Sequence, residues 1–294
     1  MIKKKYCEIC NKDNFSLLSK KIREGNCNVF FCKNCQLGIL EEKKFKEETK
    51  LYKKNKSNEI LSKERLESYK KAQILSEVNS IYNFKDKDVI EIGPGLAPLT
   101  SYYFKTTKSN FILEKNKFYA RFLKKKYKRK LKIVSKENLN SFNKKFDLCI
   151  MVHVFEHLSN PIHYLKLIEK LLKKGGSLIL ILPNLNDVYL NNLNSLQKKK
   201  YLEFNLHHGH KFYYTLNSLK KLINKYTKLR VNLNSTFQEY SVNNFFSWSL
   251  LGKGNSNFSS AIDHNLENND LDLLFKSYCK KNKIGSSIIL KASK

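Results

Sequence analysis

The chain has 294 residues, and its 56 lysines and arginines against 26 aspartates and glutamates give a formal net charge of +30. Hydrophobic residues make up 41% of the chain, which is enough for a large core and excludes an intrinsically disordered protein. The longest apolar run, residues 178–182, is far shorter than the roughly 20 residues that cross a bilayer. The basic start is not followed by the apolar segment of a secretory signal. We therefore expect a cytoplasmic protein without a membrane span.

The positive charge by itself is compatible with a nucleic-acid partner. However, the lysines are spread along the whole chain and there are only 4 prolines, a composition typical of AT-rich genomes. Nucleic acid is therefore a partner that the sequence allows but does not favour. Phosphate-bearing substrates would still be attracted to such a surface.

Four cysteines near the start form two Cys-x-x-Cys pairs: Cys7, Cys10, Cys32 and Cys35. Four thiolates on two short turns give the tetrahedral sulfur coordination that suits Zn²⁺. In a reducing cytosol, metal binding is favoured over disulfides. Because the four cysteines fill every ligand position, we expect the zinc to be structural. Cys27 lies between the pairs as a competing ligand, and residues 1–40 are assigned to a zinc-binding module.

Two further units follow along the chain. Residues 41–80 are charged, lack glycine and proline, and carry apolar residues at helical intervals, which predicts a helical bridge. From residue 81 to 294 short apolar strands alternate with helices, which predicts an α/β Rossmann-like domain with a parallel sheet covered on both faces. The strands are predicted at 88–93, 110–115, 131–135, 146–154, 177–184, 229–237 and 286–293.

Two helices of this domain have clear sequence boundaries. One begins with Pro161 and is predicted to end at Gly175-Gly176. The other covers residues 215–226, with Thr215 or Asn217 as its N-cap. Residues 238–285 separate the last two strands and are rich in asparagine, serine and aromatics, so we interpret them as an insertion over one edge of the sheet.

A glycine-rich turn follows the first strand, in the stretch DVIEIGPG at 88–95. Ligands of such folds lie at the carboxyl ends of the strands, where Gly93 and Gly95 would let the backbone come close to them. Glu114, at the end of the second strand, is placed to accept hydrogen bonds from two ribose hydroxyls. These features fit NAD and S-adenosylmethionine equally well.

Three details favour S-adenosylmethionine. Ala97 stands where a dinucleotide fingerprint would have another glycine. Glu91 lies two residues before Gly93, where a carboxylate can meet the cationic amino acid end of the donor. Finally, the segment FDLCIMVHVFEHL closes the fourth strand at 146–158.

With this segment the chain resembles the class I (Rossmann-like) S-adenosylmethionine-dependent methyltransferases. EIGPGLA at 91–97 is similar to their first motif, Glu114 to their ribose-binding acid, and LLKKGGSLILILPN to their next helix and strand. The resemblance covers residues 75–294 and implies that His153 lies in the wall of the cofactor site, with a role as a base as the second possibility. The family often has an acidic residue that contacts adenine at the end of the third strand. Here that position is Ser135, with Glu137 two residues further on. For His157, helix capping and packing are favoured over catalysis.

The acceptor side is assigned from HHGHKFYYT at 207–215. With the zinc module, it resembles bacterial sugar methyltransferases that join a four-cysteine zinc domain to a class I core. Their deoxysugar C-methyltransferases have a Tyr-His-Glu-His segment and then an aromatic, which implies His210 as the base, His208 as second choice and Tyr213 as a substrate-binding aromatic. Gly209 replaces the glutamate, so O-methylation is favoured over C-methylation. A surface cluster or a second metal site are the alternatives for these histidines.

The segment QEYSVNNFFSWSLLGKG at 238–254 resembles part of the zinc-module methyltransferases from surface-polysaccharide gene clusters. The resemblance implies a glycan substrate and five acceptor-side residues: Gln238, Tyr240, Asn243, Asn244 and Trp248. The alternative is a lid of packed aromatics.

The sequence therefore predicts an S-adenosylmethionine-dependent methyltransferase with structural zinc that acts on a sugar, nucleotide-linked or in a glycan, in surface polysaccharide biosynthesis. One alternative is an RNA methyltransferase that grips its substrate with the zinc module and the positive charge. The other is an inactive zinc-bearing scaffold that binds the donor.

Overall fold

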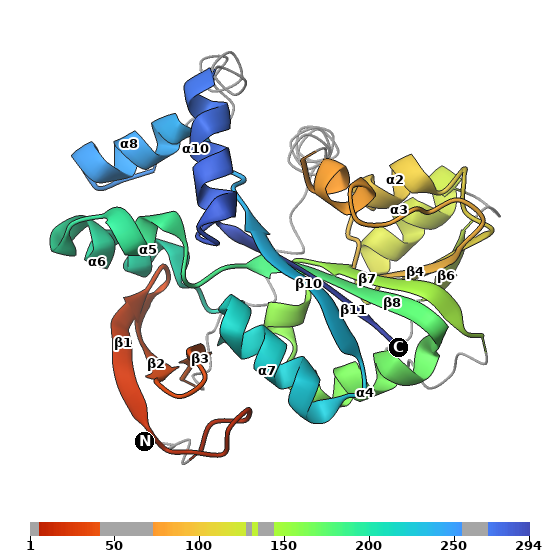
Figure 1. Ribbon diagram of the computed structural model, residues 1–294, viewed down its shortest axis with the longest axis horizontal. Helices are drawn as coiled ribbons and strands as arrows, with labels where there is room; N and C mark the ends of the chain where they lie inside the picture. The colour runs from red at the N-terminus through yellow and green to blue at the C-terminus, as the bar shows by residue number, and fades with distance from the viewer. Residues whose placement is uncertain (1–5, 42–72, 128–130, 135–143, 255–269) are drawn as a thin grey trace.

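The computed structural model describes residues 6–41, 73–127, 131–134, 144–254 and 270–294. The described strands form one sheet of seven strands and one of four, with helices packed around the larger sheet (Figure 1). No helix in these ranges is both long and apolar enough to cross a membrane.

The larger sheet has the strand order β10-β11-β8-β7-β4-β5-β6. The strands from β8 to β6 are parallel, whereas β11 is antiparallel to both of its neighbours. Central strands such as β4 are buried along their whole length, as expected for a parallel sheet covered on both faces. The strands are β4 Asp88–Ile92, β5 Ser109–Leu113, β6 Lys132–Val134, β7 Phe146–Val152, β8 Leu172–Pro183, β10 Arg230–Phe237 and β11 Ser287–Ser293.

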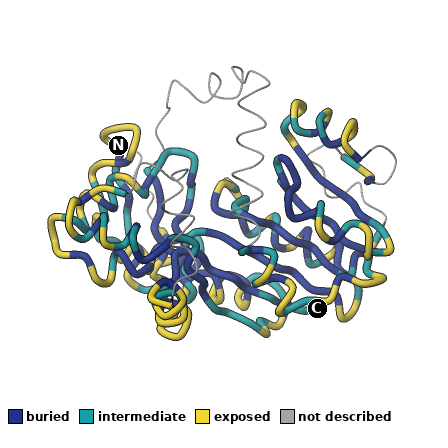
Figure 2. Tube along the Cα trace, turned by 90° about the horizontal axis from the view of Figure 1, so that it is seen from above, coloured by how far each residue is buried: buried dark blue, intermediate teal, exposed yellow. Residues whose placement is uncertain are grey.

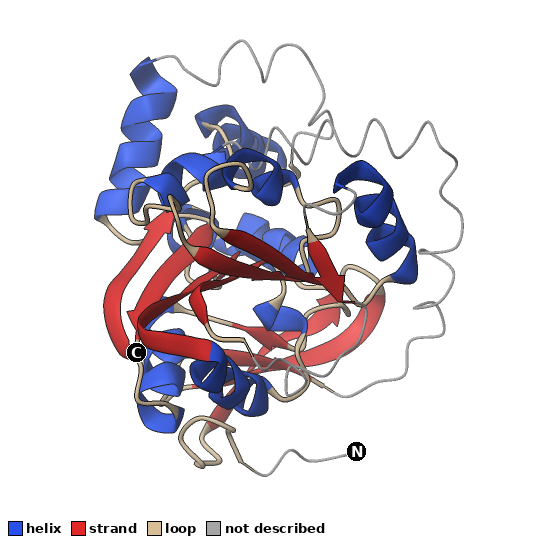
Figure 3. Ribbon diagram, turned by 90° about the vertical axis from the view of Figure 1, so that its right-hand side faces the viewer, coloured by secondary structure: helices blue, strands red, loops and turns tan. Residues whose placement is uncertain are grey.

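Helices lie on both faces of this sheet (Figures 1 and 3). One face is covered by helical residues 73–79, α2 (Pro98–Tyr103) and α3 (Lys117–Tyr127), and the other by α4 (Pro161–Leu171) and α7 (Leu216–Tyr226). Because side chains alternate along a strand, Val89 packs in the cluster that includes Leu99 of α2, while Ile90 packs in the cluster that includes Ile168 of α4. Figure 2 shows these strands as the buried centre of the molecule. The α/β prediction is confirmed.

Two predicted boundaries can be compared directly with the structure. Thr215 is the N-cap of α7, in a capping box with Ser218, so the first of the two predicted caps is correct. The prediction that the helix beginning at Pro161 ends at Gly175-Gly176 is wrong, because this helix, α4, ends at Leu171 and Leu172 is already extended. Residues 172–176 begin β8 instead, and the N–H of Gly175 donates to the Lys294 carbonyl at 3.0 Å. Pairing of Leu172 with Phe146 of β7, and of the two glycines with the end of the chain, therefore overrides the helical pattern.

The smaller sheet joins the N-terminal segment to the rest of the chain. It contains β1 (Phe15–Ile22), β2 (Gly25–Cys32), β3 (Leu37–Leu40) and, from far along the sequence, β9 (Phe212–Tyr213). The pairs Gly38↔Tyr213 and Ile39↔Phe212 connect the two parts. The side chains of Lys225 and Tyr226, at the end of α7, donate to the carbonyls of Ile9 and Glu8 at 2.7 and 2.8 Å.

A second packing unit stands beside the antiparallel edge of the large sheet. It contains α5 (Val188–Asn192), α6 (Ser195–Asn205), α8 (Val242–Leu251) and α10 (Asp270–Lys281). Tyr201 stacks on Tyr189, with ring centroids 4.7 Å apart, and meets Trp248 edge-on at 5.2 Å. The helices α8 and α10 belong to the predicted insertion, whose residues 255–269 lie outside the described residues. Residues 42–72 of the predicted helical bridge also lie outside them.

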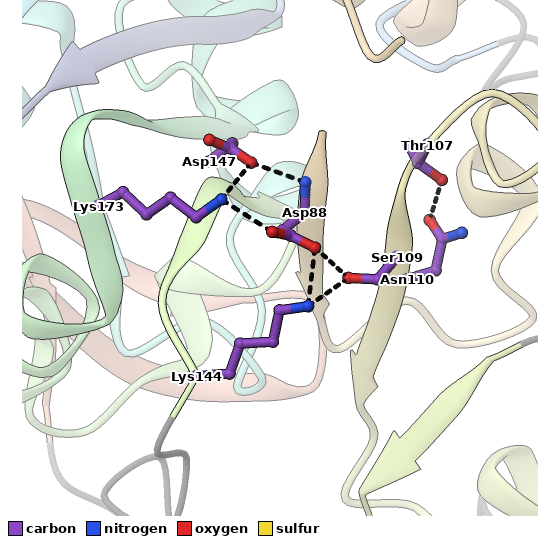
Figure 4. A network of polar contacts seen from close by, with 7 residues as sticks. All are labelled: Asp88, Thr107, Ser109, Asn110, Lys144, Asp147 and Lys173. Atoms are coloured by element: carbon purple, nitrogen blue, oxygen red, sulfur yellow. Dashed lines mark hydrogen bonds and ion pairs between the residues drawn. The ribbon is translucent and has the colours of Figure 1, made fainter. Parts of the chain in front are cut away.

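A charged network fixes the ends of β4 and β7 that lie away from the glycine turn (Figure 4). Lys173 donates to Asp88 and Asp147, both at 2.8 Å, and Lys144 donates to Asp88 at 2.7 Å. Burial alone would raise the pKa of Asp88, but hydrogen bonds from Lys144, Lys173 and Ser109 outweigh burial and lower that pKa well below its usual range. The network therefore stabilises the folded state while Asp88 is ionised.

Candidate functional site

A cavity of about 500 Å³ lies at the carboxyl ends of the central strands. It is bounded by the turn after β4, by Val152 and His153 at the end of β7, and by Pro183 at the end of β8. Its other walls come from the N-terminal sheet, from the segment 205–210 and from the ends of β10 and β11 that face it. Ligands of open α/β sheets bind at this position.

The two positions in the turn after β4 that carry glycine favour it for different structural reasons. Both have positive φ, +65° at Gly93 and +61° at Gly95, a region that favours glycine. A Cβ atom on Gly93 would lie 2.7 Å from Cγ2 of Val154, so this position is closed by packing. A Cβ atom on Gly95 would meet no atom within 4 Å, and Gly95 lines the cavity. Gly95 therefore leaves open space on the ligand side.

The two predicted cofactor acids lie behind this turn. The carboxylate of Glu114 accepts hydrogen bonds from the N–H groups of Gly95 at 3.0 Å and Asn116 at 2.7 Å, and burial raises its pKa. Glu91 lies on the α2 face of β4, where its carboxylate accepts hydrogen bonds from the hydroxyls of Thr100 and, at 2.7 Å, Tyr103. Glu114 therefore supports the cavity-lining turn directly, and Glu91 connects β4 to α2. Ser135 and Glu137 lie outside the described residues.

His153 lines the cavity directly after β7, with an unusual φ of +52°. Its ring lies between two carboxylates, with Nδ1 3.7 Å from Oε1 of Glu156 and Nε2 3.6 Å from Oε1 of Glu239. Desolvation would lower the pKa of His153, but the two carboxylates outweigh it and raise the pKa to about 10. The two carboxylates therefore favour the protonated form of this predicted cofactor-wall residue.

The three histidines of the segment 207–210 point in different directions. His207 and His210 line the cavity, while Nδ1 of His208 lies 3.2 Å from Oε1 of Glu24 in the N-terminal sheet. Burial lowers the pKa of His207 to about 4 and lowers that of His210 as well. The first predicted base thus lies at the cavity, and the second is directed towards another part of the protein.

Glu156 is a site residue that the sequence reasoning did not select. It lies in the short 3₁₀ helix Phe155–His157 after β7 and is only 1% exposed. Its Oε1 lies 3.8 Å from Nε2 of His210 and 3.9 Å from Nε2 of His157. The ring of His157 donates from Nδ1 to the carbonyl of Gly209 at 2.6 Å, so it packs on the histidine segment, while Asn160 caps α4. A glutamate and a histidine side by side directly after a strand, Glu156-His157, were the signal that could have identified this cluster.

Of the predicted acceptor-side residues, Tyr240 lines the cavity. The others serve as supports: the Tyr213 hydroxyl donates to the His207 carbonyl at 2.8 Å, Gln238 accepts from the Ser286 N–H at 2.9 Å, and Asn244 accepts from the Tyr189 hydroxyl at 2.8 Å. Trp248 is buried in the aromatic cluster and Asn243 is half-buried in α8. Their roles towards a substrate stay predictions.

Several polar lining residues had no local signal in the sequence. Arg23 reaches the cavity from the turn between β1 and β2, and its Nε donates to the Phe204 carbonyl at 2.8 Å. Asp187 caps α5 and accepts a hydrogen bond from the Tyr201 hydroxyl, and burial raises its pKa to about 7. Ser286 and Ser287 line the opposite side. The cavity is therefore rich in groups that bind hydroxyls and phosphates.

The four predicted zinc ligands lie together in the N-terminal segment. Cys7, Cys10, Cys32 and Cys35 each offer a sulfur, and the four sulfurs lie within 4.8 Å of one another. Sγ of Cys10 and Sγ of Cys32 are 3.6 Å apart, the spacing of thiolates around one tetrahedral ion. Cys27 is buried against a different cluster, where its thiol faces the Glu41 carbonyl at 3.7 Å. The cysteines present therefore fit one Zn²⁺ with four sulfur ligands.

These features define a class of protein: a Rossmann-like α/β protein with a glycine turn, an acid after the second strand of its parallel sheet and a polar cavity beside them. A family model described as a methyltransferase domain matches residues 64–226, more than half of the chain, and the chain belongs to this methyltransferase family. The methyltransferase prediction is thereby confirmed.

Solved structures agree on the fold. An S-adenosylmethionine-dependent methyltransferase from Archaeoglobus fulgidus matches with a TM-score of 0.50 and 18% identity, over 79% of this chain and 94% of that chain. One from Mesorhizobium loti matches with a TM-score of 0.50 and 9% identity, over 78% of this chain and 100% of that chain. No curated protein sequence matches the chain. At these identities the structural matches establish the fold, and the substrate is a separate question.

Proposed function

We propose that the protein transfers a methyl group from S-adenosylmethionine to a hydroxyl group of a sugar, nucleotide-linked or in a glycan, in the assembly of a surface polysaccharide. The observation that carries the proposal is one continuous cavity that adjoins both the Gly93–Gly95 turn and the rings of His207 and His210. A methyl donor at the turn and an acceptor at the histidines would then share one space, as direct transfer requires.

The donor fits the residues around the turn. The Glu114 carboxylate accepts backbone hydrogen bonds, among them those from Gly95 and Asn116, and with two lone pairs on each oxygen it retains capacity for a ribose hydroxyl. The open space at Gly95 allows the amino acid part of the donor to approach the backbone. The donor supplies an electrophilic methyl group on a sulfonium, so the protein mainly has to orient the acceptor and accept its proton.

The acceptor side supports a sugar. Asp187, Glu239, Ser287 and Tyr240 line the cavity and together offer donors and acceptors for several hydroxyls. Arg23 also lies there, and a guanidinium has five donors, of which one goes to the Phe204 carbonyl. A guanidinium in this position suits the diphosphate of a nucleotide sugar. The resemblance of residues 238–254 to polysaccharide-cluster enzymes supports the same substrate class.

Oxygen is the proposed acceptor atom, and we place it on the His207–His210 side of the cavity. A hydroxyl needs less help to lose its proton than a carbon beside a ketone, and the segment carries Gly209 where the related C-methyltransferases carry a glutamate. The zinc held by the four cysteines would have a structural role, because the pairing of β3 with β9 connects the N-terminal sheet to the histidine segment.

Two measurements test the proposal in sequence. Calorimetric titration with S-adenosylhomocysteine and with NADH should show binding of the first and not of the second. In the second measurement, a fresh sample of the protein is incubated with S-adenosylmethionine and a panel of nucleotide sugars, with tRNA in parallel. Methylated products are detected by mass spectrometry. Methylation of tRNA that falls steeply with salt would replace the sugar with RNA. Donor binding with no acceptor in any panel would indicate a binding scaffold.

A further inference from the structure

The carboxylate of Glu156 is buried among imidazoles and accepts no hydrogen bond from the described residues. The residue is 1% exposed, and neither Oε1 nor Oε2 has a hydrogen-bond partner within the described part of the chain. A buried carboxylate without hydrogen bonds is costly, since its lost hydration is not replaced. Its nearest charged or ionisable neighbours are imidazole nitrogens of His153, His157 and His210 at 3.7 to 3.9 Å, too far for hydrogen bonds. The carboxylate therefore has imidazole neighbours, but no hydrogen bond from the described residues replaces its lost hydration.

We propose that Glu156, His157 and His210 bind a divalent transition-metal ion of the Zn²⁺ type, separate from the four-cysteine zinc. One ligand atom from each residue lies within 4.8 Å of the other two. Two imidazole nitrogens and one carboxylate oxygen are a ligand set that Zn²⁺ uses where it keeps a fourth position open. In a tetrahedral site, neighbouring ligand atoms are about 3.3 Å apart. The distances of 3.8 and 3.9 Å from Oε1 to the two Nε2 atoms thus need only a small inward shift.

The tautomer of His157 is already set for metal binding. Its Nδ1 lies 2.6 Å from the Gly209 carbonyl, which can only accept, so Nδ1 carries a proton, and in the neutral ring the lone pair lies on Nε2, on the side of Glu156. Metal-bound histidines usually donate their second N–H to a carbonyl or carboxylate in this way. A Cβ atom on Gly209 would lie 3.1 Å from the His207 ring, so a glycine suits the residue whose carbonyl orients His157.

The three ligands are held by backbone contacts that do not depend on an ion. Glu156 and His157 share one 3₁₀ turn after β7, and the N–H of Lys211 donates to the Glu156 carbonyl at 2.9 Å. The same contact fixes His210, the residue before Lys211, next to that turn. Since His210 lines the cavity, the fourth position of the ion would lie beside the space that we assign to the acceptor hydroxyl. In the metal-bound protein, His210 would then act as a ligand and not as the direct proton acceptor.

The test measures zinc binding and donor binding separately on the full chain. The protein is purified with its four-cysteine site filled and titrated with Zn²⁺ in a calorimeter, while bound metal is counted by plasma mass spectrometry. We expect one further Zn²⁺ per chain, at least tenfold weaker binding in Glu156→Gln and His157→Ala, and no comparable binding of Mg²⁺, which prefers oxygen ligands. His163→Ala, an exposed histidine in α4, is the matched control and should keep the further zinc.

Donor binding shows whether each variant is folded and keeps the two proposals apart. Because the cluster does not include the glycine turn, S-adenosylhomocysteine should still bind all three variants, which shows that they are folded. A wild-type protein that binds S-adenosylhomocysteine but takes up no further Zn²⁺ would overturn the metal site and leave the proposed function standing. Equal zinc binding in wild type, Glu156→Gln and His157→Ala would also overturn it. Zinc uptake at this site without donor binding would support the metal site and count against the proposed function.

Discussion

The backbone N–H of His208 donates a hydrogen bond to Oε2 of Glu24 at 3.0 Å, although 184 residues separate the two in the chain. Glu24 lies in the turn between β1 and β2, next to Arg23 of the cavity wall. The N-terminal sheet thus holds the histidine segment and supplies part of the cavity. Loss of order in this sheet should therefore affect both stability and methyl transfer.

Replacing one predicted zinc ligand tests this connection. Cys32→Ser should release the zinc and lower Tm by at least ~5 °C, because a structural zinc contributes directly to the folding free energy. Turnover should fall as well, since β3 pairs with β9 immediately after the histidines. Zinc content, thermal unfolding and methyl transfer are measured on the same preparation. Cys27→Ser, in the same sheet, is the control, and loss of zinc from it would instead make Cys27 a ligand.

The two glycines of the turn should separate folding from donor binding. Gly95→Ala places a methyl group in open cavity space at a φ of +61°, so we expect about 1–2 kcal/mol of destabilisation and at least a tenfold rise in the Kd of S-adenosylhomocysteine. Gly93→Ala adds a 2.7 Å clash with Val154 and should destabilise more. Denaturant unfolding and calorimetry measure the two effects. Unaltered donor affinity in a folded Gly95→Ala would place the donor elsewhere.

His210→Ala should reduce turnover by about 100-fold or more and leave the affinity for S-adenosylhomocysteine within about twofold, because its ring lines the acceptor side of the cavity. His208→Ala is the matched comparison. Because the His208 ring faces Glu24, this substitution should reduce turnover by less than tenfold. Steady-state kinetics on both variants decide between the two histidines. If His208→Ala has the larger effect, the order of the two predicted residues must be reversed.

The charged network at the start of β4 should contribute to the loss of folding stability at low pH. The pKa of Asp88 is lowered in the folded state, so its stabilisation is complete above its unfolded pKa of about 4 and is lost as the pH falls towards the folded value. Asp88→Asn should therefore lower stability by about 1–2 kcal/mol at pH 7 and make it less dependent on pH below 4. Urea unfolding across pH 3–7 measures this. An unchanged acid limb in Asp88→Asn would assign acid unfolding to other groups.

Local patterns in the sequence were sufficient for the strands, the glycine turn and the four cysteines. Each of these depends on residues close together in the chain, such as the buried run of β4 or the two Cys-x-x-Cys turns. The end of α4 was missed because Leu172 leaves the helix to begin β8, where it pairs with Phe146 of β7. The orientation of Glu91 follows from strand alternation, which places it on the α2 face.

The remaining parts of the site depend on contacts between distant segments. Arg23 enters the cavity only because the N-terminal sheet packs beside residues 205–210, a contact without any signature in the residues around Arg23. Similarly, Glu156 meets His210 because the turn after β7 lies against the start of β9, as the hydrogen bond between Lys211 and Glu156 shows. In the C-methyltransferase segment that residues 207–215 resemble, a glutamate lies between the two histidines, whereas here the carboxylate next to His210 is Glu156, from the turn after β7.

Because Gly38 pairs with Tyr213, the N-terminal sheet can be completed only late in synthesis. The three strands of the N-terminal sheet leave the ribosome early, but the strand that completes their sheet is made only after most of the Rossmann-like core. Until then, the outer edge of β3 has unpaired N–H and C=O groups that other chains could join. Early zinc loading of the four cysteines, which tightens the turns on either side of this hairpin, would protect the nascent chain during that interval.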